Sequence, residues 1–178
     1  MMKLDSREFS QQAYQSLNAL KVSLEQLAQE VLIQEQEEKR KKKPGVTKVQ
    51  LTDQEIQERA KSYCEKSSGL VQGLCTYIST WGLHRLSGDA KKFSLGMASD
   101  TQYKGRVYGL FLEHLKTFSQ EDFVLWSDSK DSSDERSLVN LPLRRYTALN
   151  RLAIQLAKEW SFWATPVLGE AKENENGN

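Results

Sequence analysis

Apolar residues recur every three or four positions along most of the chain, which is the period of one face of an α-helix. The clearest case near the start is the set Ala13, Leu17, Leu20, Leu24, Leu27 and Val31. Three later segments repeat this spacing, and strand-like alternation of apolar and polar residues appears nowhere over a useful length. The pattern predicts an all-α protein with helices over residues 5–43, 53–86 and 142–168 and middle helices over 103–126.

Residues at the expected helix ends agree with these boundaries. Thr52 and Glu55 have the spacing of a capping box, in which each side chain accepts a hydrogen bond from the other residue's backbone N–H. Pro142 fits the first turn of the last helix, where its missing N–H has no helical partner to lose. The polar segments 88–101 and 127–140 are expected to be loops.

The second helix contains two glycines that weaken it. Gly69 and Gly73 each cost about 1 kcal/mol relative to alanine in a helix interior. They indicate either close approach of a neighbouring backbone on that face or a break at residues 67–69. We expect residues 1–168 to form a single-domain bundle of about five helices with a long N-terminal helix, and residues 169–178 to form a disordered acidic tail.

Composition narrows the class of protein. The chain has 178 residues, 38% of them hydrophobic, and a formal net charge of +1, so it can bury one core and has no strong overall attraction to polyanions. Cys64 and Cys75 lie roughly 16 Å apart along one expected helix, too far for a disulfide, which suits a reducing compartment. Without a membrane-length apolar run or a signal-peptide pattern, we expect a cytoplasmic protein with no membrane partner.

Few residues could carry catalysis or hold a metal. The only histidines are His84 and His114, and Glu113 points about 100° away from His114 on a helix, so the two cannot act as an acid–base pair. The acidic residues between Asp128 and Glu135 lack the spacing and central glycine of a calcium loop. We therefore expect no enzymatic activity, no cofactor, no metal site and no small-molecule substrate.

Basic residues are the stronger functional signal. The last helix carries Arg144, Arg145, Arg151 and Lys158 around its apolar stripe, opposed only by Glu159. Guanidinium and ammonium groups bind a phosphate backbone without reading sequence. The candidate RNA-binding residues are Arg85, Lys91, Lys92, Lys104, Arg106, Arg144, Arg145 and Arg151. The run 39–43, KRKKK, could also bind phosphate, but a solvated helix end is its more ordinary role.

Three stretches resemble one family. Residues 68–77, SGLVQGLCTY, resemble its Gly-Leu-x-Gln-x-Leu-x-x-Phe/Tyr segment. Residues 108–116, YGLFLEHLK, resemble its short middle helix, with 123–126 as the tryptophan segment that follows. Residues 146–160, YTALNRLAIQLAKEW, resemble its final helix. In this order they are similar to the small helical subunit of type III-B (Cmr-type) CRISPR effector complexes, over roughly residues 60–165.

This resemblance implies a non-catalytic subunit of an antiviral ribonucleoprotein complex. Several copies would stack along the guide RNA and contact guide RNA, target RNA, other subunits and copies of itself. The alternative is a helical adaptor or coiled-coil scaffold that pairs with a protein through the apolar stripe of residues 13–31 and does not bind nucleic acid. A helix-turn-helix DNA-binding protein is a weaker third reading, because no short second helix with base-reading residues follows a tight turn.

Overall fold

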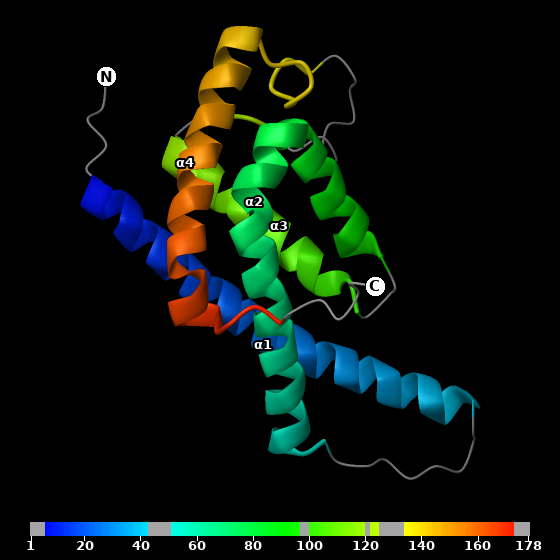
Figure 1. Ribbon diagram of the computed structural model, residues 1–178. Coiled ribbons are helices and arrows are strands. Elements are labelled where there is room, and N and C mark those ends of the chain that lie inside the picture. The colour runs from blue at the N-terminus through cyan, green and yellow to red at the C-terminus, as the bar shows by residue number, and fades with distance from the viewer. Residues whose placement is uncertain (1–5, 43–50, 97–99, 120–121, 125–133, 173–178) are drawn as a thin grey trace, which may run out of the picture.

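The structure is a computed structural model that describes residues 6–42, 51–96, 100–119, 122–124 and 134–172. Four helices occupy these ranges: α1 (Ser6–Lys42), α2 (Asp53–Leu95), α3 (Gln102–Ser119) and α4 (Leu143–Leu168) (Figure 1). The predicted all-α class is confirmed, but the predicted number of about five helices is wrong for the described residues. None of the helices in this part of the chain has an apolar stretch long enough to cross a bilayer.

The apolar stripe predicted for the first helix lies inside the bundle. Residues from Phe9 to Val31 on that stripe are buried, and α1 packs against all three other helices. After Val31 no residue of α1 is buried, and Figure 1 shows this end of the helix extending beyond the rest of the bundle. The first part of α1 therefore belongs to the core, and its basic end does not.

The centre of the core is aromatic. The side chains of Phe111 on α3 and Trp160 on α4 are fully buried, and their rings meet edge to face with centroids 5.1 Å apart. Such a pair adds about 0.5–1.5 kcal/mol beyond the free energy of burying its area. Tyr63 on α2 is also buried and stacks on Tyr103 of α3 at 5.9 Å. These contacts tie α2, α3 and α4 together.

The second helix begins as predicted and bends where no bend was predicted. Both hydrogen bonds of the capping box between Thr52 and Glu55 are present. The helix runs without a break through residues 67–69, where Ser67 and Ser68 are buried at its packing surface. Its one non-helical residue is Gly82, with φ 77° and ψ 167°. Figure 1 shows α2 turning sharply there.

Contacts with α4 hold this bend in place. The backbone N–H of Leu83 is left without a helical acceptor by the bend, and it donates to Asn150 Oδ1 at 3.2 Å. His84 Nδ1 lies 2.9 Å from Tyr146 Oη. The predicted helix end at residue 86 and the predicted loop 88–101 are therefore wrong in part, because α2 continues to Leu95 and buries Leu86, Ser87 and Ala90.

The segment between α3 and α4 also departs from the prediction. Helix α3 ends at Ser119, and residues 122–124 are extended where the middle helices were expected to reach 126. Val124 donates its N–H to Arg136 O at 2.9 Å and accepts from Leu138 N at 3.4 Å. The side chain of Phe123, next to Val124, is fully buried, so this segment packs on the core without forming a helix. Trp126 lies outside the described residues.

The last helix matches its predicted span to within one residue. It begins at Leu143, directly after Pro142, and ends at Leu168, which is followed by Gly169, whose φ of 93° favours glycine. Pro166 lies inside the last turn and does not end the helix. The predicted tail, residues 169–178, is described only as far as residue 172. The Cβ of Ala171 lies 3.6 Å from the position that a Cβ added at Gly69 would take.

Candidate nucleic-acid interface

A row of basic side chains follows the outer face of α4. Arg144, Arg151 and Lys158 are each seven residues apart, which is about two turns and about 10.5 Å of helix rise. Successive members drift by only about 20° around the axis, so they remain nearly in line. All three are exposed, whereas Leu149, Leu156 and the other apolar residues of the opposite face are buried. We call these three residues the α4 row.

The charge of the α4 row is not neutralised by carboxylates in the part of the chain that the structure describes. No carboxylate of the described residues forms an ion pair with Arg144, Arg151 or Lys158. The single carboxylate of the helix, Glu159, follows Lys158 and therefore points about 100° away from it. The row thus presents positive charge to solvent along more than half of the helix.

The start of α4 adds to this positive potential. Its first turn contains no acidic residue, and Pro142 provides no side-chain cap for the free backbone N–H groups. A helix N-terminus carries the equivalent of about half a positive charge, which is unfavourable beside arginine. An anion placed there would relieve this repulsion. Arg145 is also exposed, but it lies about 100° from Arg144 and has an interaction of its own, so it does not belong to the row.

The other predicted RNA-binding residues gather elsewhere. Lys92 at the end of α2 and Lys104 on α3 both lie against the ring of Phe93, with Nζ–centroid distances of 5.5 and 5.2 Å. Lys91 is exposed beside them and also has an interaction. This second basic group, which we call the Phe93 group, is separated in sequence and by element from the α4 row.

Two predicted arginines are already engaged. Arg106 forms an ion pair with Glu30 of α1 at 3.0 Å, which leaves little net charge at that point. The guanidinium of Arg85 stacks over the exposed ring of Trp81 at 4.7 Å, next to the bend at Gly82. The eight predicted residues are therefore not one patch. Arg144 and Arg151 share a face, whereas Lys92 and Lys104 share another.

The predicted RNA-binding residues left out one member of the α4 row and one further residue on its face. Lys158 was recognised as a basic flank but was not among the predicted RNA-binding residues. Phe162, one turn further on, is 68% exposed and was not considered. A signal for it exists in the sequence, because an aromatic residue four positions after Lys158 falls outside the apolar stripe and on the basic face.

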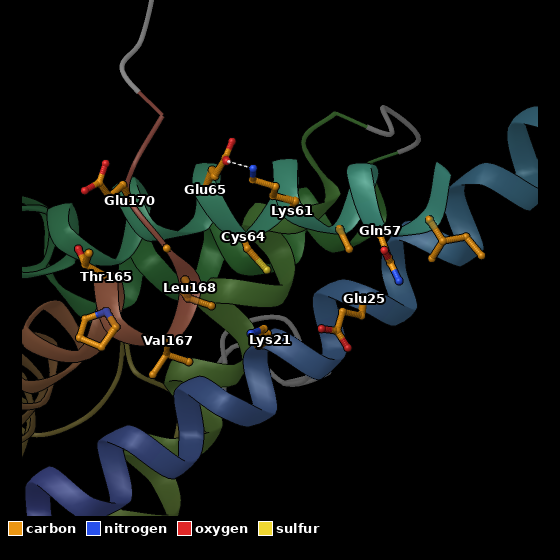
Figure 2. A pocket seen from close by; sticks show the side chains of 14 residues that line it. Lys21, Glu25, Gln57, Lys61, Cys64, Glu65, Thr165, Val167, Leu168 and Glu170 are labelled. Atoms are coloured by element: carbon orange, nitrogen blue, oxygen red, sulfur yellow. Dashed lines mark ion pairs between the residues drawn. The ribbon is translucent and has the colours of Figure 1, made fainter. Parts of the chain in front are cut away.

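A separate cavity of about 720 Å³ lies between α1, α2 and the end of α4 (Figure 2). Its apolar wall includes Cys64 and Leu168, and its rim mixes acidic and basic residues, with Lys61 and Glu65 paired at 3.9 Å. Burial raises the pKa of the Cys64 thiol. The thiol form is a poor nucleophile, and no histidine lines the cavity, so its chemistry does not suggest a reactive centre.

The two histidines have structural partners. Trp160 Nε1 donates to His114 Nδ1 at 3.3 Å, and burial lowers the pKa of His114. A ring that accepts at Nδ1 is neutral and carries its proton on Nε2. His84 contacts Tyr146 at the bend of α2, as described above. The two lie on different helices, and each contacts an aromatic residue of α4.

Comparisons of this chain with protein-family models, with curated proteins and with solved structures found no match. The resemblance to the CRISPR subunit therefore stays a prediction from sequence.

Proposed function

We propose that this chain is a non-catalytic RNA-contacting subunit, and that it serves as the small subunit of a type III CRISPR effector complex. The observation that carries RNA contact is the α4 row: three exposed cations in line on one rigid helix, without a carboxylate partner among the described residues. The assignment to a CRISPR complex adds the sequence resemblance. The proposed work is electrostatic and geometric.

A polyphosphate is the ligand that this spacing favours. Each cation that approaches a phosphate releases condensed counterions, and the affinity gained this way is independent of base sequence. A single small anion could occupy only one position of the row, whereas a backbone that follows the helix could reach all of them. The uncapped N-terminus of α4 lies at one end of the same face and favours negative charge there.

The surface that the scaffold alternative requires is buried within the bundle. That alternative needs the apolar stripe of α1 to face a protein partner, yet the residues of that stripe, from Ala13 to Val31, are covered by the chain's own helices. A partner could pair with them only if the bundle opened. This favours the RNA-contact proposal over pairing through that stripe.

The direct test is RNA affinity across a salt series. The variant Arg144→Ala/Arg151→Ala/Lys158→Ala removes three cations from the row. Each phosphate contact contributes about −0.7 to the slope of log K against log salt for a single strand, so the slope should become shallower by about 2. The same relation predicts roughly 100-fold weaker binding at about 0.1 M salt if all three contacts are made.

A matched control removes the same charge from another surface. Lys39→Ala/Arg40→Ala/Lys41→Ala changes the exposed end of α1, which projects from the bundle, by the same three charges. Equal losses in the two variants would mean that the α4 row has no special role, because either net charge or the basic run 39–43 would account for binding as well. Co-purification of the tagged chain with guide RNA from its native host tests the CRISPR assignment separately, and recovery without RNA or other subunits would contradict it.

A further inference from the structure

Phe162 is an exposed aromatic side chain at the end of the α4 row. It is 68% exposed, and it follows Lys158 by four residues, so it occupies the same outer face as the three cations. A large apolar side chain on a charged face contributes nothing to the core.

The ring of Phe162 is held from one side by a chain of contacts. Trp163 meets it edge to face, with centroids 5.0 Å apart. Trp163 is itself fixed, because its Nε1 donates to Ser10 Oγ at 2.9 Å and its ring meets Tyr14 edge to face at 5.1 Å. A ring supported in this way loses less rotational freedom when a ligand stacks on it. Despite this contact, Phe162 remains 68% exposed.

Charge decides between two possible occupants of this ring. A protein partner would need to bury Phe162 together with Lys158 and then supply carboxylates for the cations of the row. A nucleic-acid strand supplies both requirements at once: phosphates for the cations and a flat base for the ring. The in-line arrangement of Arg144, Arg151, Lys158 and Phe162 therefore favours a strand.

We propose that Phe162 stacks on an unpaired base of an RNA strand whose phosphates lie along the α4 row. This inference rests on the proposed function, and it adds that the bound strand is unpaired at this end of the helix. A paired base in an A-form duplex has both of its faces occupied by neighbours, so it cannot offer one to Phe162 except at a duplex end. Backbone contact alone would not distinguish bases from bare sugar-phosphate.

The test compares two probes with the same number of phosphates. One is a single-stranded RNA of about 12 nucleotides, and the other is an abasic strand of equal length, both followed by fluorescence anisotropy. Stacking on one aromatic ring corresponds to roughly 5- to 150-fold in affinity. The wild-type chain should bind the RNA about tenfold more tightly than the abasic strand. Phe162→Ala should remove this preference and leave abasic binding unchanged.

Two further variants keep the test interpretable. Phe162→Trp retains an aromatic face and should retain the preference for bases. Leu143→Ala removes an apolar side chain that is 79% exposed at the other end of α4, and it should change neither affinity. Circular dichroism of each variant establishes that the helices are intact.

The outcomes separate this inference from the proposed function. If the wild-type chain binds neither strand, RNA contact itself is wrong. If it binds both strands equally through Arg144, Arg151 and Lys158, the row binds phosphate and the stacking inference alone is wrong. Equal weakening of both strands by Phe162→Ala also overturns stacking. Self-association that disappears in Phe162→Ala, with RNA affinity unchanged, would assign the ring to a second copy of the chain.

Discussion

The bend at Gly82 provides the sharpest test of how this bundle is held together. Its φ of 77° and ψ of 167° lie in a region that only glycine populates readily, so Gly82→Ala should cost about 1–3 kcal/mol in backbone strain. A Cβ at this position would also lie 2.4 Å from Tyr146 Oη and 3.1 Å from His84 Nδ1. Moving Tyr146 away would break its hydrogen bond with His84, at a further cost of about 1 kcal/mol.

The expected loss in the free energy of unfolding is therefore about 2–4 kcal/mol. Urea unfolding followed by circular dichroism measures it by linear extrapolation. Gly73→Ala is the matched control, because a Cβ at Gly73 meets no atom within 4 Å. That residue lies in a helix interior, so alanine should stabilise the protein by about 1 kcal/mol.

A double variant separates steric conflict from backbone strain. Tyr146→Phe removes the hydroxyl that the new Cβ would meet and also removes the hydrogen bond to His84. Gly82→Ala/Tyr146→Phe should therefore be less destabilised than the sum of the two single variants, by about 1 kcal/mol or more. Additive losses would show that residue 82 and Tyr146 do not meet. A Gly82→Ala protein within about 0.5 kcal/mol of the wild type would refute the reasoning altogether.

Two predictions concern pH. Burial lowers the pKa of His114, so stability should be retained above about pH 6.5 and lost as the pH falls towards the folded-state pKa. Replacement by glutamine should flatten that part of the urea-unfolding profile. Burial and, after it, the hydrogen bond to Asp89 raise the pKa of Tyr77. Stability should therefore also fall above about pH 10, because the unfolded chain then releases a proton that the native protein keeps. Asp89→Asn should lower the pKa of Tyr77 in an ultraviolet absorbance titration, and an unchanged titration would contradict this assignment.

Helix class and most of the buried stripes could be predicted because both depend on local periodicity. The capping box of Thr52 and the span of α4 follow from residues a few positions apart. The bend could not be placed in this way, because its cause is contact with Tyr146 and Asn150, more than 60 residues later. The spacing of residues along α2 does carry a local sign of the bend. The buried residues of α2 step by five from Ile78 to Leu83, which breaks the helical spacing directly at Gly82.

The candidate site was harder to predict because exposure and pairing are tertiary properties. A basic residue on an amphipathic helix can face solvent or a carboxylate, and the sequence does not distinguish them. Arg106 meets Glu30 from a different helix, whereas Arg151 meets no carboxylate among the described residues. Phe162 was missed because an aromatic residue is usually assigned to the core.

The bend and the basic row depend on the same turns of α4. Tyr146 and Asn150 contact the bend of α2, whereas Arg144, two residues before Tyr146, and Arg151, one residue after Asn150, are exposed. Because side chains on one helix rotate together, the contacts at Gly82 also determine the direction in which the row points. Phosphates bound along the row would stabilise the native state and not the unfolded chain, by RT ln(1 + [L]/Kd). RNA contact and the geometry of the bend are therefore expected to be coupled through α4.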